Sequence, residues 1–268
     1  MSDLFDFGGR HVFVAGGTSG INLGIAKGFA RAGAKLSVLS RSQSKVDAAV
    51  ETLCQLGAEA QGFALDVRDS EAVDDALAAA VMAFGPLDVL ISGAAGNFTA
   101  PAADITANGF KSVVDIDLLG TFNVVRAAYP HLSKPGGCVV NISAPQAAQP
   151  VLMQAHVCAA KAGGNKLTEV LAMEWGPEGI RVNAISPGPI EGTEGMARLA
   201  PNEAARQLTA QSVPLKRFGD VTDIANAAMF LCSPLGDYIN GAILPVDGGW
   251  VLAGASSLGD KLARLQAA

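Results

Sequence analysis

A glycine-rich segment near the amino terminus has the composition of a phosphate-binding turn. Residues 15–24 read Ala-Gly-Gly-Thr-Ser-Gly-Ile-Asn-Leu-Gly and follow a short apolar run. Glycines in such a turn let the backbone approach a pyrophosphate, which the N–H groups and positive dipole of a following helix then bind. We therefore expect a dinucleotide site that includes Gly16, Thr18, Ser19, Gly20 and Ile21.

Ser40 and Arg41 indicate which dinucleotide this site prefers. They follow the second apolar run, Ser37-Val38-Leu39. An acidic residue at this place would accept hydrogen bonds from the ribose 2′-hydroxyl of NAD, whereas a small hydroxyl followed by arginine leaves room and positive charge for a 2′-phosphate. The pair favours NADPH as the cofactor. The alternative is that Arg41 is only a solvated charge at a helix start.

Lys161 lies in a segment that lacks an expected partner. The run Ala155-His-Val-Cys-Ala-Ala-Lys161 resembles the catalytic helix of the short-chain dehydrogenase/reductase family, which usually carries Tyr-x-x-x-Lys with a Ser thirteen residues before the Tyr. Those two positions hold Val157 and Ala144 here. The two tyrosines of the chain, Tyr129 and Tyr238, lie elsewhere. The usual proton donor of the family is therefore missing, although its lysine is present.

Asp117 occupies the place of another catalytic residue of that family. The run Asp115-Ile-Asp-Leu-Leu-Gly-Thr-Phe resembles the family motif Asn-x-x-Gly-Thr-Phe, with Asp117 at the position of the Asn. Burial disfavours the charged form of a carboxyl group, and a nearby lysine favours it. We expect Asp117 and Lys161 to be catalytic; the alternative is a structural ion pair that holds Lys161 against the cofactor ribose. His156 could also shuttle protons, but it points about 100° away from its helix neighbour Val157.

Loops after three of the apolar runs resemble further cofactor contacts of the family. Asp66-Val67 resembles its adenine contact, and Gly93-Ala94-Ala95-Gly96 resembles its Asn-Asn-Ala-Gly loop. Pro187-Gly188-Pro189-Ile190 with Thr193 resembles its nicotinamide and pyrophosphate contacts. The resemblance, which spans about residues 9–249, implies that these segments and Lys161 bind the cofactor.

The glycine-rich turn departs from the family pattern at two places. The family pattern is Thr-Gly-x-x-x-Gly-x-Gly, and Gly16 and Gly20 match it. Ala15 and Asn22 do not. Because asparagine tolerates unusual backbone angles better than most residues, we expect the turn to form nevertheless, with the helix slightly farther from its neighbours.

One group within the family shares the altered catalytic set. The run Ala94-Ala95-Gly96-Asn97-Phe98, together with residues 115–117, 154–156, 174–177 and 187–195, resembles the 2,4-dienoyl-CoA reductases, especially the peroxisomal type. That group also lacks the Tyr and Ser and has an Asp at the position of Asp117. The resemblance implies an acyl-CoA substrate whose acyl chain is bordered by Asn97 and Phe98; the alternative for Phe98 is that it is a plain core residue.

The missing tyrosine is consistent with such a substrate. Reduction of a carbonyl forms an alkoxide that must be protonated in place, which a Tyr beside Lys achieves. A conjugated dienoyl thioester instead accepts hydride at its distal alkene carbon and forms a dienolate, so the proton is needed at carbon. By the resemblance, Lys161 would position the nicotinamide ribose and Asp117 would hold or activate a proton-donating water. The alternatives are a carbonyl or alcohol oxidoreductase with a rewired proton donor, and a catalytically silent NADP-binding protein.

The elements that must position these residues alternate along the chain. Short apolar runs followed by longer Ala-rich amphipathic stretches predict a parallel sheet with right-handed crossovers. We therefore expect a single α/β domain over residues 1–268, with a Rossmann-like, doubly wound sheet of seven strands. The expected strands are 11–15, 35–39, 61–65, 89–92, 139–143, 182–186 and 242–246. The expected helices are 22–32, 42–56, 70–84, 109–132, 155–175 and 221–231.

Two further expectations come from the positions of two glycines and from the length of one connection. Gly33 and Gly57 come just after expected helices, where positive φ ends the last turn. The stretch from Pro187 to Val213 is too long for a simple connection, and such length is usually functional. We interpret this stretch as a lid over the substrate; the alternative is a plain surface excursion.

The composition of the chain limits its possible binding partners and its cellular location. The 268 residues, half of them apolar, suit one large domain, and 19 basic against 25 acidic residues give a net charge of −6. Such a chain offers no basic surface for nucleic acid. The four cysteines are widely spaced and there are three histidines, which argues against a metal site and fits a reducing cytosol. No export signal or membrane span is visible, so we expect a cytoplasmic protein; the family resemblance implies a homotetramer.

Overall fold

The central sheet is built from short runs that are buried between two layers of helices. The structure is a computed structural model in which residues 5–200 and 202–252 are described. All strand pairs are parallel, in the order β3-β2-β1-β4-β5-β6-β7. The strands are β1 His11–Ala15, β2 Lys35–Ser40, β3 Ala60–Ala64, β4 Val89–Ser92, β5 Cys138–Ile142, β6 Arg181–Pro187 and β7 Ile243–Val246. The order reverses between β1 and β4, where open α/β sheets bind their ligands beyond the carboxyl ends of the strands.

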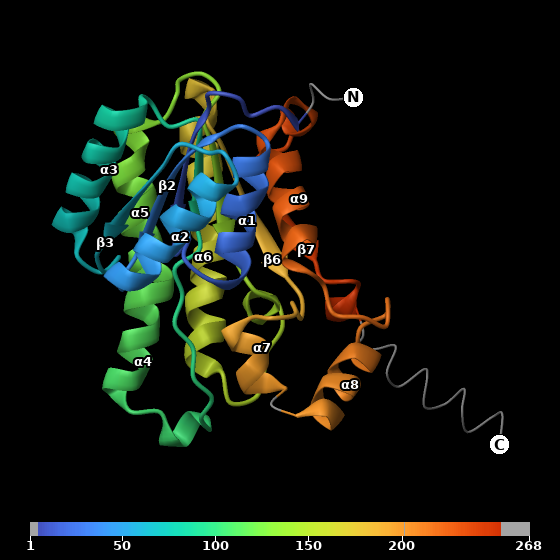
Figure 1. The fold of residues 1–268 in the computed structure, drawn as a ribbon. Helices are drawn as coiled ribbons and strands as arrows, with labels where there is room; N and C mark the ends of the chain where they lie inside the picture. The colour runs from blue at the N-terminus through green and yellow to red at the C-terminus, as the bar shows by residue number, and fades with distance from the viewer. Residues whose placement is uncertain (1–4, 201, 253–268) are drawn as a thin grey trace, which may run out of the picture.

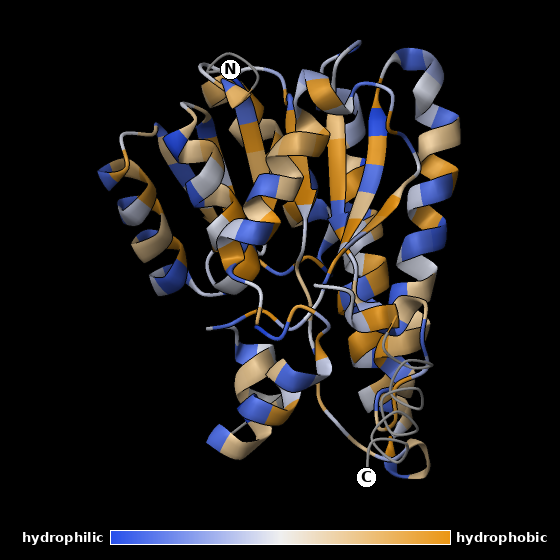
Figure 2. Cartoon of the chain, turned by 90° about the vertical axis from the view of Figure 1, so that its right-hand side faces the viewer, coloured by the Kyte–Doolittle hydropathy of each residue, from blue (hydrophilic) through white to orange (hydrophobic). Residues whose placement is uncertain are grey.

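Helices cover both faces of this sheet (Figure 1), and a hydrophobic core lies between the sheet and each helix layer. One core is formed with α1 (Gly20–Arg31), α2 (Gln43–Gln55) and α9 (Val221–Cys232). The other is formed with α3 (Ser70–Phe84), α5 (Gly120–Ala128) and α6 (Ala155–Trp175). Figure 2 shows hydrophobic strands between helices that also carry hydrophilic residues, as a sheet covered on both faces requires.

The doubly wound, seven-stranded fold confirms the expectation from the sequence. Strands β1 and β4 and helices α3 and α6 have the expected ends, and the other strands end within one residue of them. Gly33 and Gly57 follow α1 and α2 with φ of +86° and +90°. These glycines therefore end the helices as expected.

The stretch expected as one helix over residues 109–132 contains an irregular turn. It consists of α4 (Ala107–Val114), a π-helical turn η3 (Asp115–Leu119), α5, and a 3₁₀ turn η4 (Tyr129–His131). A π turn adds one residue to a helix without interrupting it, and such turns are frequent at functional sites. Hydrophobic periodicity does not reveal one inserted residue. The expectation of a uniform helix was therefore wrong at Asp117.

The stretch from Pro187 to Val213 contains two helices that the sequence did not predict. They are α7 (Glu194–Leu199) and α8 (Glu203–Ser212). Thr193 and Asn202 cap them, because each side chain accepts a hydrogen bond from a backbone N–H in the first turn. Figure 1 places both helices below the sheet. In the described part of the chain, none of the helices combines the length and apolar character needed to cross a membrane.

Candidate active site

The glycine-rich turn joins β1 to α1 and leaves the first turn of that helix accessible. Gly16 and Gly20 have φ of +78° and +51°, which L side chains rarely adopt. A Cβ on Gly17 would lie 2.8 Å from the backbone oxygen of Val14, so this position has no room for a side chain. The turn therefore requires glycine at these places. It presents the free N–H groups at the start of α1, which bind anions.

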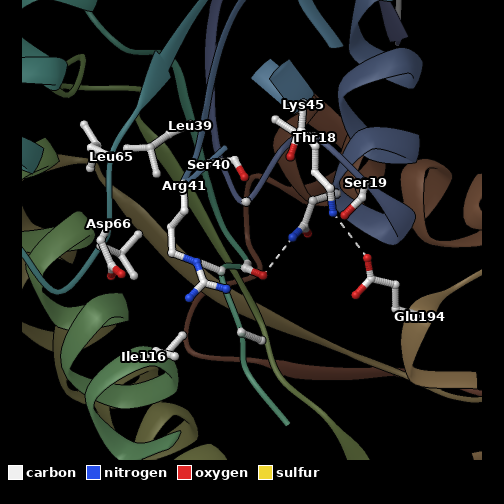
Figure 3. A pocket seen from close by; sticks show the side chains of 16 residues that line it. Thr18, Ser19, Leu39, Ser40, Arg41, Lys45, Leu65, Asp66, Ile116 and Glu194 are labelled. Carbon is white, nitrogen blue, oxygen red and sulfur yellow. Dashed lines mark hydrogen bonds and ion pairs between the residues drawn. The ribbon is translucent and has the colours of Figure 1, made fainter. Parts of the chain in front are cut away.

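A first cavity, of about 220 Å³, lies between this turn and the ends of β2 and β3. Arg41 reaches into it from the end of β2 (Figure 3). A hydrogen bond from Arg68 lowers the pKa of Asp66, which is therefore a carboxylate at neutral pH. The predicted cofactor residues that line this cavity are Gly16, Thr18, Ser19, Ser40, Arg41, Asp66, Val67, Ala94 and Ala95.

A second cavity, of about 330 Å³, continues the first along the carboxyl ends of the strands. Ser19, Asn22, Gly93 and Ala95 line both, so that the two form one cleft. The predicted site residues that line the second cavity are Ser19, Ile21, Ala95, Asn97, Asp117, Lys161, Pro187, Gly188, Pro189, Ile190 and Thr193. The sequence thus placed most of its candidates in one continuous cleft.

Asp117 and Lys161 form a buried ion pair in the second cavity. Their relative exposures are 3% and 8%, and Lys161 Nζ lies 3.5 Å from Asp117 Oδ2. The Gly96 N–H donates to Asp117 Oδ1 over 2.7 Å, and Lys161 Nζ donates to the Ile142 carbonyl over 3.0 Å. The pair therefore joins the π turn, the loop after β4, helix α6 and the end of β5. This arrangement fixes both charged groups beside the cavity.

The wall around this ion pair is apolar where the family usually has hydroxyl groups. Ala144 and Val157, which replace the Ser and Tyr, line the cavity that contains Lys161. The neighbouring Ser143 hydroxyl donates to Asn165 Oδ1 over 2.5 Å. Neither replaced position can therefore donate a proton to an alkoxide. The ionisable side chain that lines this cavity from the π turn is that of Asp117.

His156 lies beneath the loop after β4 and does not line the cleft. It is fully buried, and its ring centroid is 4.3 Å from that of Phe98. Neither ring nitrogen has a hydrogen-bond partner of good geometry among the described residues. Burial lowers the pKa of His156, and the Asp117 carboxylate and Phe98 backbone oppose this effect more weakly. The neutral imidazole is therefore the favoured form.

Three predicted residues are near the cleft but are not among the residues that line its two cavities. Gly20 begins α1, and Gly96 donates its N–H to Asp117. Phe98 is partly exposed and packs on His156. These three residues therefore contact or hold residues near the cleft and do not line its cavities. In the described ranges 5–200 and 202–252, no group of three or more His, Cys, Asp or Glu residues could hold a metal ion.

The sequence reasoning missed several residues of the cleft. Lys45 and Glu194 line the first cavity and form an ion pair of 3.4 Å (Figure 3). Lys45 lies four residues after Arg41, in the first turn of α2, a position that could have indicated a second cation. Gln146, Met196 and Trp250 line the second cavity. Met196 falls within the expected lid, whereas nothing in the sequence pattern singled out Gln146.

A doubly wound sheet with a cleft at its switch point is the architecture of dinucleotide-binding oxidoreductases. Residues 15–251 match a family model described as Enoyl-(Acyl carrier protein) reductase. The chain belongs to the short-chain dehydrogenase/reductase family, as its motifs predicted, and is an oxidoreductase.

Particular relatives agree with the narrower resemblance. The peroxisomal 2,4-dienoyl-CoA reductase of Rattus norvegicus is 44% identical over 239 residues, which cover 88% of this chain and 82% of the relative. A probable 2,4-dienoyl-CoA reductase of Bacillus subtilis is 42% identical over 243 residues, which cover 90% of this chain and 96% of the relative. An Agrobacterium tumefaciens protein crystallised with bound NADP is 32% identical, with a TM-score of 0.84 and coverage of 93% and 99% of the two chains.

Proposed function

We propose that the protein reduces a conjugated 2,4-dienoyl acyl-CoA thioester with NADPH, a reaction of fatty-acid β-oxidation. The observation that carries this proposal is the buried Asp117–Lys161 pair in a cavity where Ala144 and Val157 replace the usual hydroxyl groups. Such a site suits protonation of carbon better than protonation of an alkoxide. The names of the rat and Bacillus subtilis relatives support the same substrate class.

The cleft has the shape and the donors that NADPH needs. The positive φ of Gly16 and Gly20 gives the tight turn that lets a backbone approach a phosphate group closely. The start of α1 would hold the pyrophosphate, and Ser40 and Arg41 would hold the 2′-phosphate, with Lys45 beside them. Lys161 would hold the nicotinamide ribose. The relative with bound NADP supports this choice of cofactor.

The residues of the chain then have distinct roles in the proposed reaction. When bound, NADPH would supply a hydride for the distal alkene carbon of the substrate. The negative charge that this addition leaves on the substrate is delocalised to the thioester oxygen, which gives a dienolate. A proton must next reach carbon. Asp117, fixed by the Gly96 N–H and by Lys161, holds or activates the water that donates this proton. Asn97 borders the acyl chain from the loop after β4.

We also propose that residues 187–213 cover the cleft as a lid. Glu194 of α7 pairs with Lys45 beside the first cavity, and Met196 of the same helix lines the second. Both contacts support a covering role for α7 over cofactor and substrate. Cys54, Cys138, Cys158 and Cys232 are all free thiols, which supports a cytoplasmic location. The family resemblance supports a homotetramer.

The proposed reaction is tested by following NADPH absorbance with three substrates in parallel. These are a 2,4-dienoyl-CoA, a 3-ketoacyl-CoA and a simple aldehyde. We expect turnover of the dienoyl-CoA alone, and faster turnover with NADPH than with NADH. Turnover of only the ketone or aldehyde would replace the proposal with a carbonyl oxidoreductase. Tight NADPH binding without any turnover would instead indicate a catalytically silent cofactor-binding protein.

A further inference from the structure

Asn22 fills the space above Gly93, at the place where the loop after β4 passes the start of α1. A Cβ built on Gly93 would lie 2.3 Å from Asn22 Oδ1 and 2.5 Å from Asn22 Nδ2. A Cβ on Gly16 would lie 3.0 Å from the same nitrogen. The amide group of Asn22 is therefore wedged between two positions that lack side chains. Neither glycine could be replaced without moving it.

One atom of this amide is bonded and the other is not. Asn22 Nδ2 donates to the Gly93 carbonyl over 2.7 Å, which ties α1 to the end of β4. Asn22 Oδ1 is buried and has no hydrogen-bond partner among the described residues. The residue as a whole is 9% exposed. A buried acceptor without a partner costs free energy unless a ligand supplies a donor.

Asn22 also stands at the junction of the two halves of the cleft. It lines the cavity that contains Arg41 and the cavity that contains Lys161. A dinucleotide bound along this cleft would pass this point with its pyrophosphate and a ribose. Pyrophosphate oxygens only accept hydrogen bonds, whereas ribose hydroxyls donate them. A free carbonyl oxygen at this place therefore matches a ribose hydroxyl.

We propose that Asn22 is a positioning residue for the dinucleotide, with Oδ1 as acceptor for a ribose hydroxyl and Nδ2 as a tie to the loop after β4. The inference rests on the cofactor part of the proposed function and not on its substrate. The inference also explains two departures from the family pattern, at Asn22 and at Gly93, as a single swap of Asn and Gly between neighbouring positions. The pattern has Gly where Asn22 stands and Asn where Gly93 stands, and the close approach of these positions allows only one of them to carry the amide.

The test is a double-mutant cycle on NADPH affinity, measured by the quenching of protein fluorescence, together with the thermal midpoint of each variant. The variants are Asn22→Gly, Gly93→Asn, and the two combined. We expect Asn22→Gly to weaken NADPH binding about three- to tenfold, the range of one lost hydrogen bond. Gly93→Asn alone should weaken binding more, because the new side chain meets the amide of Asn22. The combined variant should bind more tightly than Gly93→Asn alone.

A matched control separates cofactor contact from damage to the helix. Lys27→Gly places the same flexible residue on α1 but outside the cleft, so it should lower the thermal midpoint without weakening NADPH binding. Unchanged NADPH affinity in Asn22→Gly would overturn the inference, and so would strictly additive effects in the combined variant. If the unchanged protein bound no NADPH, both the proposal that NADPH is the cofactor and this inference would be wrong.

Discussion

Asp117 has two structural partners as well as its proposed chemistry, so its role must be tested with a conservative change. It accepts the Gly96 N–H and pairs with Lys161. Asp117→Asn keeps an acceptor for Gly96 but removes the ionisable group. We expect kcat with a dienoyl-CoA to fall about 100-fold, the lower range for a lost acid–base group, and NADPH affinity to change less than about threefold. Steady-state kinetics and fluorescence titration measure the two quantities.

Asp115 offers a control for this prediction on the same π turn. It pairs with Lys111 and does not line the second cavity. Asp115→Asn should therefore leave kcat unchanged. If Asp117→Asn also turned over at the normal rate, Asp117 would be only the structural partner of Lys161.

Arg41 is expected to decide the choice between the two phosphorylation states of the cofactor. Its side chain lies in the first cavity beside Ser40, where a 2′-phosphate would bind (Figure 3). Arg41→Ala removes a charge-assisted contact and should weaken NADPH binding about tenfold, with little effect on NADH. Titration with both cofactors measures the ratio, and Arg31→Ala in the last turn of α1 is the control outside the cleft. An unchanged preference would show that Arg41 is a solvated charge.

Two buried histidines make stability depend on pH in a defined range. Burial lowers the pKa of His11 and of His156 below the ordinary value of 6.5. Between that value and the lower folded pKa, the unfolded chain binds more protons than the folded one. The free energy of unfolding should therefore be insensitive to these groups above pH 6.5 and should fall as the pH drops below it.

Urea denaturation at closely spaced pH values measures this effect. His156→Phe removes one of the two groups and keeps an aromatic ring against Phe98, so the decline below pH 6.5 should become shallower. His11 has ring hydrogen bonds to Ser37 and Gly85 and accounts for the remaining slope. Identical slopes in the variant and the unchanged protein would contradict the assignment to His156.

At the scale of elements, sequence periodicity located nearly every strand and helix. It did not locate the π turn that contains Asp117. Runs such as Val89–Ser92 are short, apolar and bounded by turns, so their strand structure follows from local sequence. The π turn Asp115–Leu119 depends on how α4 and α5 each pack, which is a tertiary property. Helices α7 and α8 are short and lie in a polar stretch, where hydrophobic periodicity gives little signal.

The π turn itself can be tested by removing its extra residue. Leu119 is 45% exposed, and its deletion should convert the turn to ordinary α-helix. Because α5 is anchored in the core by Val124, Val125 and Ala128, the preceding residues should rotate by about 100°, and Asp117 should leave Lys161. We expect loss of turnover with retained helical circular dichroism. Leu119→Ala, which keeps the residue count, should stay active; normal turnover of the deletion variant would contradict the role of the turn.

At the scale of the molecule, the candidate site could be predicted because the carboxyl ends of parallel strands meet at one edge. Residues as distant in sequence as Ser19, Asn97 and Lys161 therefore line one cavity. Contacts that arise from the path of the long connection were not predictable. The ion pair between Lys45 and Glu194 joins α2 to α7, and their partnership follows only from the way residues 187–200 return over the cleft.

The surface of the molecule bears on the proposed homotetramer. Several apolar side chains are exposed on α6 and on the adjoining π turn and α5; Met173 is 80% exposed and Phe122 is 41% exposed. Large exposed apolar side chains that lie on neighbouring elements are candidates for an interaction surface. We expect sedimentation to give four times the chain mass of 27.2 kDa. Phe122→Glu combined with Met173→Glu would place charges in the interface and should yield smaller species.

Met82 provides the matched control for this last prediction. It is 87% exposed, like Met173, but it lies on α3, away from α6. Met82→Glu should leave the mass unchanged, because an isolated exposed apolar residue needs no partner. If the unchanged protein sedimented as a single chain, the homotetramer would be wrong. If the double variant kept the full mass, the interface would lie elsewhere, since two buried glutamates without partners would cost several kcal/mol.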